Sequence, residues 1–293
     1  MRKYEVIFFD WDGTAVLSRN TPADVAARFM APLLASGVKL VILSGTSFKN
    51  IDGGKLPERF EREHLANLYF GLDRGANNYG FDKLGNIISI PGVLVGQNEI
   101  KKLHQVCFDF HMKLLENYAL NTDIIFCRDN YCKIDIGSNI CRGSKFFFTG
   151  NELELINVGL VSHGYAEGIS GLITLAEALG REHGLTLRAT TDAKYIELGF
   201  GTKSDNVDAI LSHLEAAAGR RLDCCFWGDE FLEMDSGVYG SDAFMITEKT
   251  KAFGFFDVSE VEGKRPKQVQ RVGGGVERFL SFLNDQACKT PRN

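Results

Sequence analysis

The chain has 293 residues, of which 44% are hydrophobic, 24% are charged and only six are proline. This is the composition of a soluble globular protein rather than of a disordered one, and the length favours two domains over a single core. The 38 acidic residues outnumber the 33 lysines and arginines, so the net charge of −5 gives no general attraction for nucleic acid or for an anionic membrane.

The first predicted element is a strand that ends in two acids. Four consecutive large apolar residues, Val6 to Phe9, indicate a strand buried on both faces, as in the middle of a parallel sheet. Asp10 and Asp12 follow, and they project to the same side because side chains alternate along an extended chain. Ligands of open α/β sheets bind at this end of the strands, and a magnesium ion would relieve the repulsion between the two carboxylates. The alternative is a strand end followed by an ordinary Asp-Gly turn.

A helix is predicted next. Thr21 and Pro22 are typical of an N-cap and a first helical turn, and Gly37 is a typical helix stop. The apolar residues at a spacing of four between them are Val25, Phe29 and Leu33.

The second predicted strand, Val38 to Leu43, ends in Ser44 and Gly45. A strand, a helix and a strand in this order predict a parallel crossover unit. A hydroxyl group beside a glycine at a strand end lets the hydroxyl and backbone N–H groups approach a phosphoryl oxygen. Taken alone the signal is weak, because Ser-Gly also forms ordinary turns.

The middle of the chain has a different pattern. A further core strand is expected at Leu68 to Gly71, followed by the segment GANNYG, which contains Asn78. From about residue 82 to 190, short strands follow one another with helices between them, which predicts an antiparallel sheet covered by helices. The expected elements are strands at 87–90, 123–127, 131–136 and 145–149 and helices at about 100–114 and 172–183.

The last third returns to the pattern of the core. A strand is expected at Tyr195 to Phe200, and a helix then runs from Lys203 to Ala218, with Gly219 as its stop. A lysine at the N-terminus of a helix opposes the helix dipole unless an anion lies beside it, although a surface lysine is the simpler alternative. The next apolar run, Leu222 to Trp227, is followed by Asp229 and Glu230. Closing strands are expected at 243–247 and 253–256.

Taken together and in order, these four motifs resemble those of the haloacid dehalogenase superfamily. The segment DWDGT is similar to its DxDGT signature, in which the first acid, Asp10 here, is the nucleophile that becomes an aspartyl-phosphate. The second acid, Asp12, is then the general acid and base. Ser44 and Lys203 resemble the second and third motifs, which hold the transferring phosphate, and Asp229 resembles the fourth, which completes the magnesium site.

The resemblance extends to the domain organisation. It is with the sugar-phosphatase and phosphomannomutase-like branch, which carries a large α+β cap (subclass IIB). It implies an α/β fold with a Rossmann-like parallel-sheet core, residues 1–81 and 191–293, and an inserted cap, residues 82–190, that sets substrate specificity.

Further site residues are carried over from this branch. Asn78 is the nearest counterpart of an Asn-Gly element that precedes the cap, with an Asn-rich turn as the alternative. The segment CRDNYCKIDIGSNICRG is similar in outline to a phosphomannomutase stretch whose arginines grip the non-reacting phosphate. The expected substrate-binding residues are Ser44, Gly45, Asn78, Arg142 and Lys145, with Arg128 and Lys133 close by in the sequence. A solvated basic face is the alternative for the cap residues.

The magnesium ligands are expected to be Asp10, Asp12, Asp229 and one further acid. Glu230 stands first, and Glu233, Asp235 and Asp242 compete with it.

The function expected from the resemblance is that of a Mg²⁺-dependent phosphatase acting on a small phosphomonoester, a sugar phosphate in the first instance, through an aspartyl-phosphate. A phosphomannomutase-like isomerase is the alternative, although the arginine pattern of the mutases is broken here as Ile136-Gly137-Ser138. A non-catalytic sugar-phosphate sensor is the least favoured.

The expected partner is a small phosphorylated molecule, with a homodimer left open and neither nucleic acid nor membrane. The seven scattered cysteines are expected as free thiols in the cytoplasm. No apolar stretch is long enough to span a membrane, and the first strand begins too early to follow a signal peptide.

Overall fold

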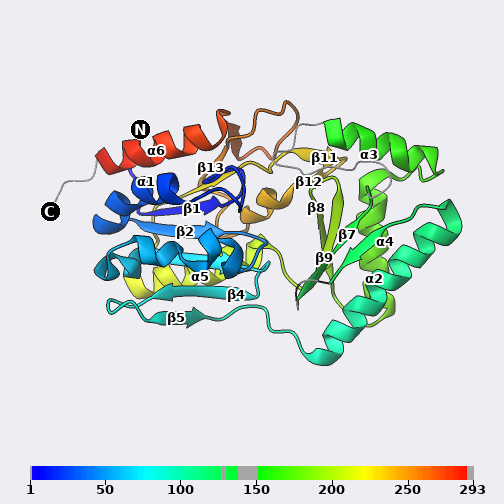
Figure 1. Ribbon diagram of the computed structural model, residues 1–293, viewed down its shortest axis with the longest axis horizontal. Coiled ribbons are helices and arrows are strands. Elements are labelled where there is room, and N and C mark those ends of the chain that lie inside the picture. The colour runs from blue at the N-terminus through cyan, green and yellow to red at the C-terminus, as the bar shows by residue number, and fades with distance from the viewer. Residues whose placement is uncertain (1, 127, 129, 138–150, 289–293) are drawn as a thin grey trace.

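The fold of the chain places two sheets side by side. The computed structural model describes residues 2–126, 128, 130–137 and 151–288. A core built on an eight-stranded sheet carries an inserted cap built on a four-stranded sheet (Figure 1). Within these ranges, no helix combines the length and the apolar character needed to cross a membrane.

The core sheet is parallel at its centre, as predicted. Its strand order is β14-β13-β10-β1-β2-β3-β4-β5, with β4 and β5 antiparallel at one edge. Every residue of β1 is buried, and Phe8 pairs with Phe226 on one side and Val41 on the other. The strands are β1 Val6–Asp10, β2 Lys39–Leu43, β3 Leu68–Leu72, β4 Asn77–Phe81, β5 Ile87–Ile90, β10 Cys224–Gly228, β13 Gly254–Asp257 and β14 Val269–Arg271.

Helices cover both faces of the core sheet. Helices α1 (Asp24–Ala35) and α6 (Gly275–Cys288) lie on one face, and α5 (Lys203–Ala218) lies on the other (Figure 1). Four short 3₁₀ turns lead from β2 to β3: η1 Phe48–Asn50, η2 Asp52–Gly54, η3 Leu56–Arg59 and η4 Arg62–Asn67.

Helix α1 differs from the prediction at its start. It begins at Asp24, and the hydroxyl group of Thr21 accepts a hydrogen bond from the backbone of Ser18 in the preceding turn, so Thr21 does not cap the helix. The expected apolar face is buried only in part: Leu33 is buried and Phe29 packs against the core, whereas the exposed fraction of Val25 is 49%. The buried face consists of Ala26, Ala27, Met30, Leu33 and Leu34.

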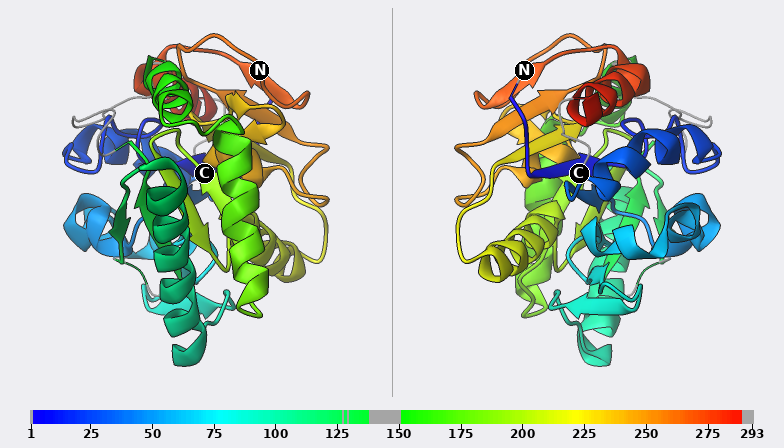
Figure 2. Two further views of the ribbon diagram at one scale, coloured as in Figure 1. Left: turned by 90° about the vertical axis from the view of Figure 1, so that its right-hand side faces the viewer. Right: turned by 90° about the vertical axis from the view of Figure 1, so that its left-hand side faces the viewer.

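The cap is an antiparallel sheet with helices on one face, which confirms the predicted α+β class. Its strand order is β6-β7-β9-β8, and α2 and α4 run side by side over it (Figure 2, left). The strands are β6 Asp123–Ile125, β7 Tyr131–Asp135, β8 Arg188–Thr191 and β9 Tyr195–Gly199, and the helices are α2 Gln97–Tyr118, α3 Asn151–Ser162 and α4 Gly168–Glu182. The expected strand at 145–149 lies outside the described residues, and α3 was not predicted.

The sheets divide the chain at other points than 82 and 190. Strand β5 hydrogen-bonds to β4 and so belongs to the core, although it was expected in the cap. Strand β9 was expected in the core, but it pairs with β7 and β8 in the middle of the cap sheet. The connections between core and cap are therefore residues 91–96 and 200–202.

Residues 243–247 were expected to form a strand, but the structure has a short helix here. The segment Ser241–Met245 is a 3₁₀ helix, η5, and it follows a small hairpin of β11 (Glu233–Asp235) and β12 (Val238–Tyr239). The turn is favoured because the buried side chain of Asp242, in its first turn, accepts hydrogen bonds from the backbone N–H groups of Asp229 and Glu230.

Candidate active site

The carboxyl ends of three neighbouring strands meet beneath the cap. Asp10 ends β1, Ser44 follows β2 and Asp229 follows β10, and β1 lies between the other two strands. These residues line a cavity of about 550 Å³, whose other walls include strands of the cap. The predicted grouping of polar residues at one edge of the sheet is therefore present.

Asp10 is buried and paired with the first residue of α5. The ammonium group of Lys203 lies 2.5 Å from Oδ1 of Asp10. Thr202 sets the start of the helix: its side chain accepts from the N–H of Ser204, and its own N–H donates to Asp205. Burial raises the pKa of Asp10 well above its usual value, and the positive charge of Lys203 works in the opposite direction.

Asp242 is the second partner of Lys203. Its Oδ1 lies 2.6 Å from Nζ of Lys203, and its Oδ2 accepts from the N–H groups of Asp229 and Glu230 at 2.9 and 2.8 Å. Burial by itself would lower the pKa of Lys203, but the carboxylates of Asp10 and Asp242 outweigh it and raise that pKa well above its usual value. Asp242 is completely buried and does not line the cavity, so it positions Lys203 without facing the substrate.

Asp12 faces the cavity with one carboxylate oxygen free. Its Oδ2 lies 3.1 Å from a guanidinium nitrogen of Arg19, whereas its buried Oδ1 has no hydrogen-bond partner. Burial raises the pKa of Asp12, and Arg19 opposes the shift. Arg19 also lines the cavity. Arg19 was not predicted from the sequence, because a lone arginine in a loop carries no pattern that would single it out.

Asp229 packs against the turn that follows β1. Its Oδ1 accepts a hydrogen bond of 3.1 Å from the hydroxyl group of Thr14. Gly13 has a positive φ of 84°, and a Cβ atom there would lie 2.2 Å from Oδ2 of Asp229. Glycine is thus required for this carboxylate to approach the turn. Burial and the neighbouring charges of Glu230 and Asp10 raise the pKa of Asp229 well above its usual value.

The four competing acids after Asp229 are sorted by their surroundings. Glu230 lines the cavity and accepts from Ser241, whereas Glu233 accepts from the backbone of Gly237 and pairs with Lys264. Asp235 accepts from the backbone N–H of Ser170 in the cap, and Asp242 anchors Lys203. Of the four, only Glu230 reaches the cavity.

The carboxylates that line the cavity are ligands that Mg²⁺ prefers, but they do not converge on one point with the geometry of a metal site. Among the residues that the structure describes, no three Asp, Glu, His or Cys side chains are arranged to hold a metal ion. Asp10 and Asp12 turn to Lys203 and Arg19 instead, as mutually repelling carboxylates do. The unpartnered Oδ1 of Asp12 and the raised pKa values of Asp10, Asp12 and Asp229 fit a group of acids that awaits a cation.

Ser44 and Gly45 lie in the cavity wall as expected. Ser44 is buried, and its hydroxyl oxygen accepts a 3.2 Å hydrogen bond from the N–H of Thr46. The carbonyl oxygen of Gly45 accepts a 2.6 Å hydrogen bond from the hydroxyl group of Tyr131, which ties cap strand β7 to the core.

Asn78 does not reach the cavity. It lies in β4, where its side chain donates to the carbonyl oxygen of Pro91 and accepts from Asn206. The structure therefore places it in a buried polar network between the sheet and α5, and not at the site expected from its position before the cap. Arg142 and Lys145 lie outside the described residues.

The cap side of the cavity carries several charged residues. Arg128, Lys133, Lys194 and Glu197 come from the cap, and Arg74 comes from the turn between β3 and β4. Lys133 pairs with Glu197, Lys194 with Asp135 and Arg128 with Asp73. Arg74, Lys194 and Glu197 were not anticipated, since their places in the fold depend on how β9 and the β3–β4 turn face each other.

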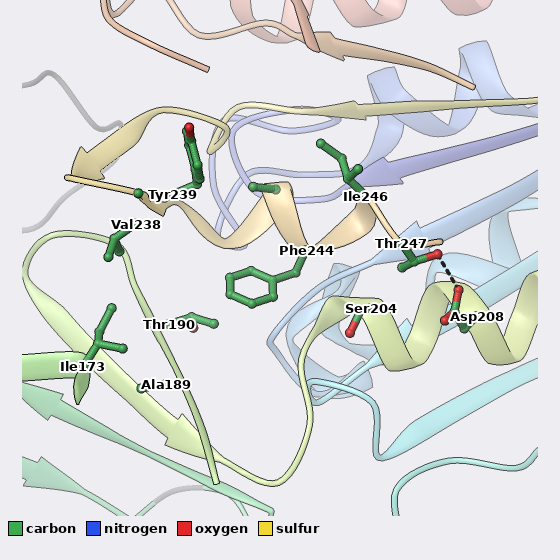
Figure 3. Close-up of a pocket in the computed structure, with 12 residues that line it drawn as sticks. Ile173, Ala189, Thr190, Ser204, Asp208, Val238, Tyr239, Phe244, Ile246 and Thr247 are labelled. Atoms are coloured by element: carbon green, nitrogen blue, oxygen red, sulfur yellow. Dashed lines mark hydrogen bonds between the residues drawn. The ribbon is translucent and has the colours of Figure 1, made fainter. Parts of the chain in front are cut away.

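A second pocket of about 520 Å³ adjoins the cavity along the seam between cap and core (Figure 3). Phe244 and Thr190 line both spaces. The pocket is mainly apolar, with Ile173 and Ala189 on the cap side and Val238 and Ile246 on the core side. Phe244 lies on η5, two residues after Asp242, so this short helix both lines the pocket and anchors Lys203.

Comparisons with solved structures find this architecture in phosphatases. The N-terminally truncated IMP-nucleotidase of Plasmodium falciparum superposes with a TM-score of 0.59 at 12% identity, over 99% of this chain and 71% of that one. The sucrose-phosphatase of Synechocystis sp. PCC6803, in complex with sucrose and phosphate, gives 0.51 at 11% identity, over 97% and 99%. At the level of sequence, no family model and no curated protein matches the chain.

These likenesses show the fold. The chain has the Rossmann-like core with an inserted cap that is found in phosphatases of the haloacid dehalogenase type. This confirms the fold class expected from the four motifs.

Proposed function

We propose that the protein is a Mg²⁺-dependent phosphatase that hydrolyses a small phosphomonoester, a sugar phosphate in the first instance, through an aspartyl-phosphate on Asp10. The observation that carries the proposal is the convergence of Asp10, Asp12, Ser44 and Lys203 in one cavity closed by the cap. The structural neighbours, a nucleotidase and a sucrose-phosphatase, support phosphomonoester hydrolysis as the class of reaction.

The chain's own residues supply the two chemical steps. In the first, a carboxylate oxygen of Asp10 attacks phosphorus, and Asp12 gives its proton to the departing alkoxide oxygen. In the second, Asp12 takes a proton from water as the water oxygen attacks phosphorus, and the bond to Asp10 breaks to release inorganic phosphate. The raised pKa of Asp12 suits a group that must hold a proton at the start of the first step.

Lys203 and Ser44 bind and orient the phosphoryl group. The ammonium group of Lys203 offsets negative charge on Asp10 and on the phosphoryl oxygens, and the hydroxyl group of Ser44 donates to one of them. Asp10, Asp12, Asp229 and Glu230 would hold Mg²⁺, which would neutralise charge on the phosphoryl oxygens and favour the ionised form of Asp10.

The charges in the cavity fit a single phosphate group. Among the described residues, its lining contains six cationic side chains and six carboxylates, so the side chains are balanced when every carboxylate, Asp12 included, is ionised. One divalent cation and one dianionic phosphomonoester would preserve that balance, because their charges cancel. The cations are Arg19, Arg74, Arg128, Lys133, Lys194 and Lys203, and the carboxylates are Asp10, Asp12, Asp192, Glu197, Asp229 and Glu230.

A phosphomannomutase-like isomerase is the alternative and has less support. A mutase must hold a second phosphate while it turns over, and the described cap cations Arg128, Lys133 and Lys194 each have a carboxylate partner already. The two residues expected to form that grip, Arg142 and Lys145, lie outside the described residues, so their part stays a prediction.

The test is a screen of phosphorylated metabolites for release of inorganic phosphate, with Mg²⁺ and with chelator. Glucose 6-phosphate, glucose 1-phosphate and inosine 5′-monophosphate should be included, and Asp10→Asn is the blank. Metal-dependent phosphate release that the blank lacks is the expected result. Interconversion of hexose 1- and 6-phosphates with little phosphate released would replace the phosphatase with the mutase, and Arg142→Ala and Lys145→Ala would then be expected to abolish the exchange.

A further inference from the structure

One buried cation in the cavity has no role in the chemistry described above. Arg74 lies in the turn between β3 and β4, and only 2% of its surface is exposed. Its side chain lines the cavity, on the side that the cap covers. Burying a guanidinium group costs free energy unless its N–H groups make hydrogen bonds, so the partners of Arg74 indicate its role.

The partners of Arg74 leave part of the guanidinium group unused. Nη1 lies 3.5 Å from Oε2 of Glu197, and the central carbon lies 5.2 Å from the ring centre of Tyr131. Nη2 is buried and has no hydrogen-bond partner. Lys133 lies closer to Glu197 than Arg74 does, so Glu197 is paired mainly with Lys133.

The backbone of this turn is fixed where the cap joins the core. The side chain of Asn130, in the cap, donates to the carbonyl oxygen of Asp73, and the N–H of Val93 donates to that of Gly75. The second connection between cap and core, residues 200–202, packs directly against the turn, since a Cβ atom on Gly201 would lie 2.2 Å from the carbonyl oxygen of Arg74. Arg74 itself has a φ of +51°, a conformation that costs free energy in a residue with a side chain.

We propose that Arg74 binds the substrate and that its Nη2 donates to an oxygen atom of the leaving group. This rests on the proposed phosphatase function. The phosphoryl end of the substrate belongs with Asp10, Ser44 and Lys203, whereas the guanidinium group of Arg74 lies beside Tyr131 and Glu197 on the cap strands. A leaving group rich in oxygen, a sugar or another polyhydroxylated alcohol, would supply the missing acceptor.

A purely structural role makes a different prediction. If Arg74 served only to pair with Glu197, then Glu197→Gln and Arg74→Gly would impair the protein alike. If Arg74 binds the leaving group, Glu197→Gln leaves the donor in place. Glycine is the apt replacement for Arg74, since it adopts a positive φ without strain and so removes the side chain without straining the turn.

The experiment measures binding by calorimetry in the Asp10→Asn background, where turnover is blocked. Two probes are compared: glucose 6-phosphate, whose leaving group carries hydroxyl acceptors, and phenyl phosphate, whose leaving group carries none beyond the ester oxygen. Loss of one charge-assisted hydrogen bond predicts that Arg74→Gly weakens binding of glucose 6-phosphate by roughly 10- to 100-fold. Binding of phenyl phosphate should change by less than about threefold, and Glu197→Gln should keep the preference for glucose 6-phosphate. Added methylguanidinium should restore part of the lost affinity in Arg74→Gly.

Equal weakening for both probes, or none for either, would overturn the inference, as would failure of both to bind to the Asp10→Asn protein. Equal losses in Glu197→Gln and Arg74→Gly would also overturn it, in favour of the structural pair. If the probes bind with the expected dependence on Arg74 but the wild-type protein hydrolyses no phosphate ester, Arg74 remains a ligand-binding residue and the proposed phosphatase function fails.

Discussion

The ammonium group of Lys203 lies 2.5 Å from the carboxylate of Asp10, deep beneath the cap. The same ammonium group is held from the other side by Asp242, which in turn accepts from the backbone after β10. The end of β1, the start of α5 and the segment after β10 are thereby joined through one cation. Stability and activity depend on different members of this chain of contacts, which variants can separate.

The nucleophile is the first member to test. Asp10→Asn keeps the shape of the side chain but removes the attacking charge, so turnover should fall by at least about 10⁴-fold. Because burial already raises the pKa of Asp10, the free energy of unfolding should not drop by more than about 1 kcal/mol. Phosphate release and urea denaturation measure the two effects. Asp285→Asn on α6 is the matched control, and a tenth of the wild-type activity in Asp10→Asn would contradict the mechanism.

Asp242 should behave in the opposite way. Asp242→Asn leaves the buried Lys203 with one carboxylate fewer, and the single amide oxygen of asparagine cannot serve both Lys203 and the two backbone N–H groups. Breaking such a buried pair is expected to lower the free energy of unfolding by about 3 kcal/mol. Denaturation in urea measures the change. A loss below that of Asp10→Asn would show that Lys203 is anchored by something else.

The metal requirement should distinguish the acids after β10. Asp229→Asn and Glu230→Gln each remove an anionic oxygen ligand from the cavity, so the Mg²⁺ concentration for half-maximal activity should rise at least about tenfold, or activity should vanish. Glu233→Gln is the control, because Glu233 pairs with Lys264 away from the cavity. Titration of activity with Mg²⁺ after chelation measures the effect. An equal shift in the control would remove the basis for choosing Glu230.

The sequence predicted the residues at the ends of the core strands well and those on the cap side of the cavity poorly, and the difference has a physical origin. Asp10, Ser44 and Asp229 follow long apolar runs, and the ends of neighbouring parallel strands must meet, so local patterns suffice to group them. Arg74 and Glu197 face each other from short segments that lie 123 residues apart in the sequence. Tyr195 to Phe200 could not be told from a core strand either, because burial gives the same apolar pattern in both sheets.

The ion pairs that Glu197 makes beneath the cap should make the free energy of unfolding depend on pH in the acidic range. Burial alone would raise the pKa of Glu197, but the charges of Lys133 and Arg74 outweigh it and lower the pKa to about 2. A lowered pKa means that the contribution to stability is fully present above the ordinary value of 4.5 and is lost as the pH falls from there towards 2. The amount is at most about 3 kcal/mol.

Glu197→Gln isolates this contribution from those of the other carboxylates. Its free energy of unfolding should lie below that of the wild type at pH 6, and the gap should narrow as the pH is lowered to 3. Urea denaturation at a series of pH values measures the gap. A gap that stays constant between pH 6 and 3 would show that Glu197 titrates normally in the folded protein.

Two glycines with the same backbone conformation offer a test of the close approach at β1. Gly13 and Gly37 have φ values of 84° and 85°. A Cβ atom on Gly13 would lie 2.2 Å from the carboxylate of Asp229, whereas one on Gly37 would meet nothing within 4 Å. Alanine at either position adopts a positive φ at a cost of about 1 kcal/mol. The two variants therefore share the backbone strain and differ in the clash.

Gly37→Ala should lose about 1 kcal/mol of stability and keep its activity. Gly13→Ala must in addition push Asp229 away from the hydroxyl group of Thr14, so its activity should fall by at least about 100-fold, and more Mg²⁺ should be needed to recover what remains. Phosphate release across a Mg²⁺ titration, with denaturation of both variants alongside, measures these effects. If Gly13→Ala kept the wild-type activity and Mg²⁺ requirement, Asp229 would not depend on this turn for its position, and its place among the metal ligands would have to be given up.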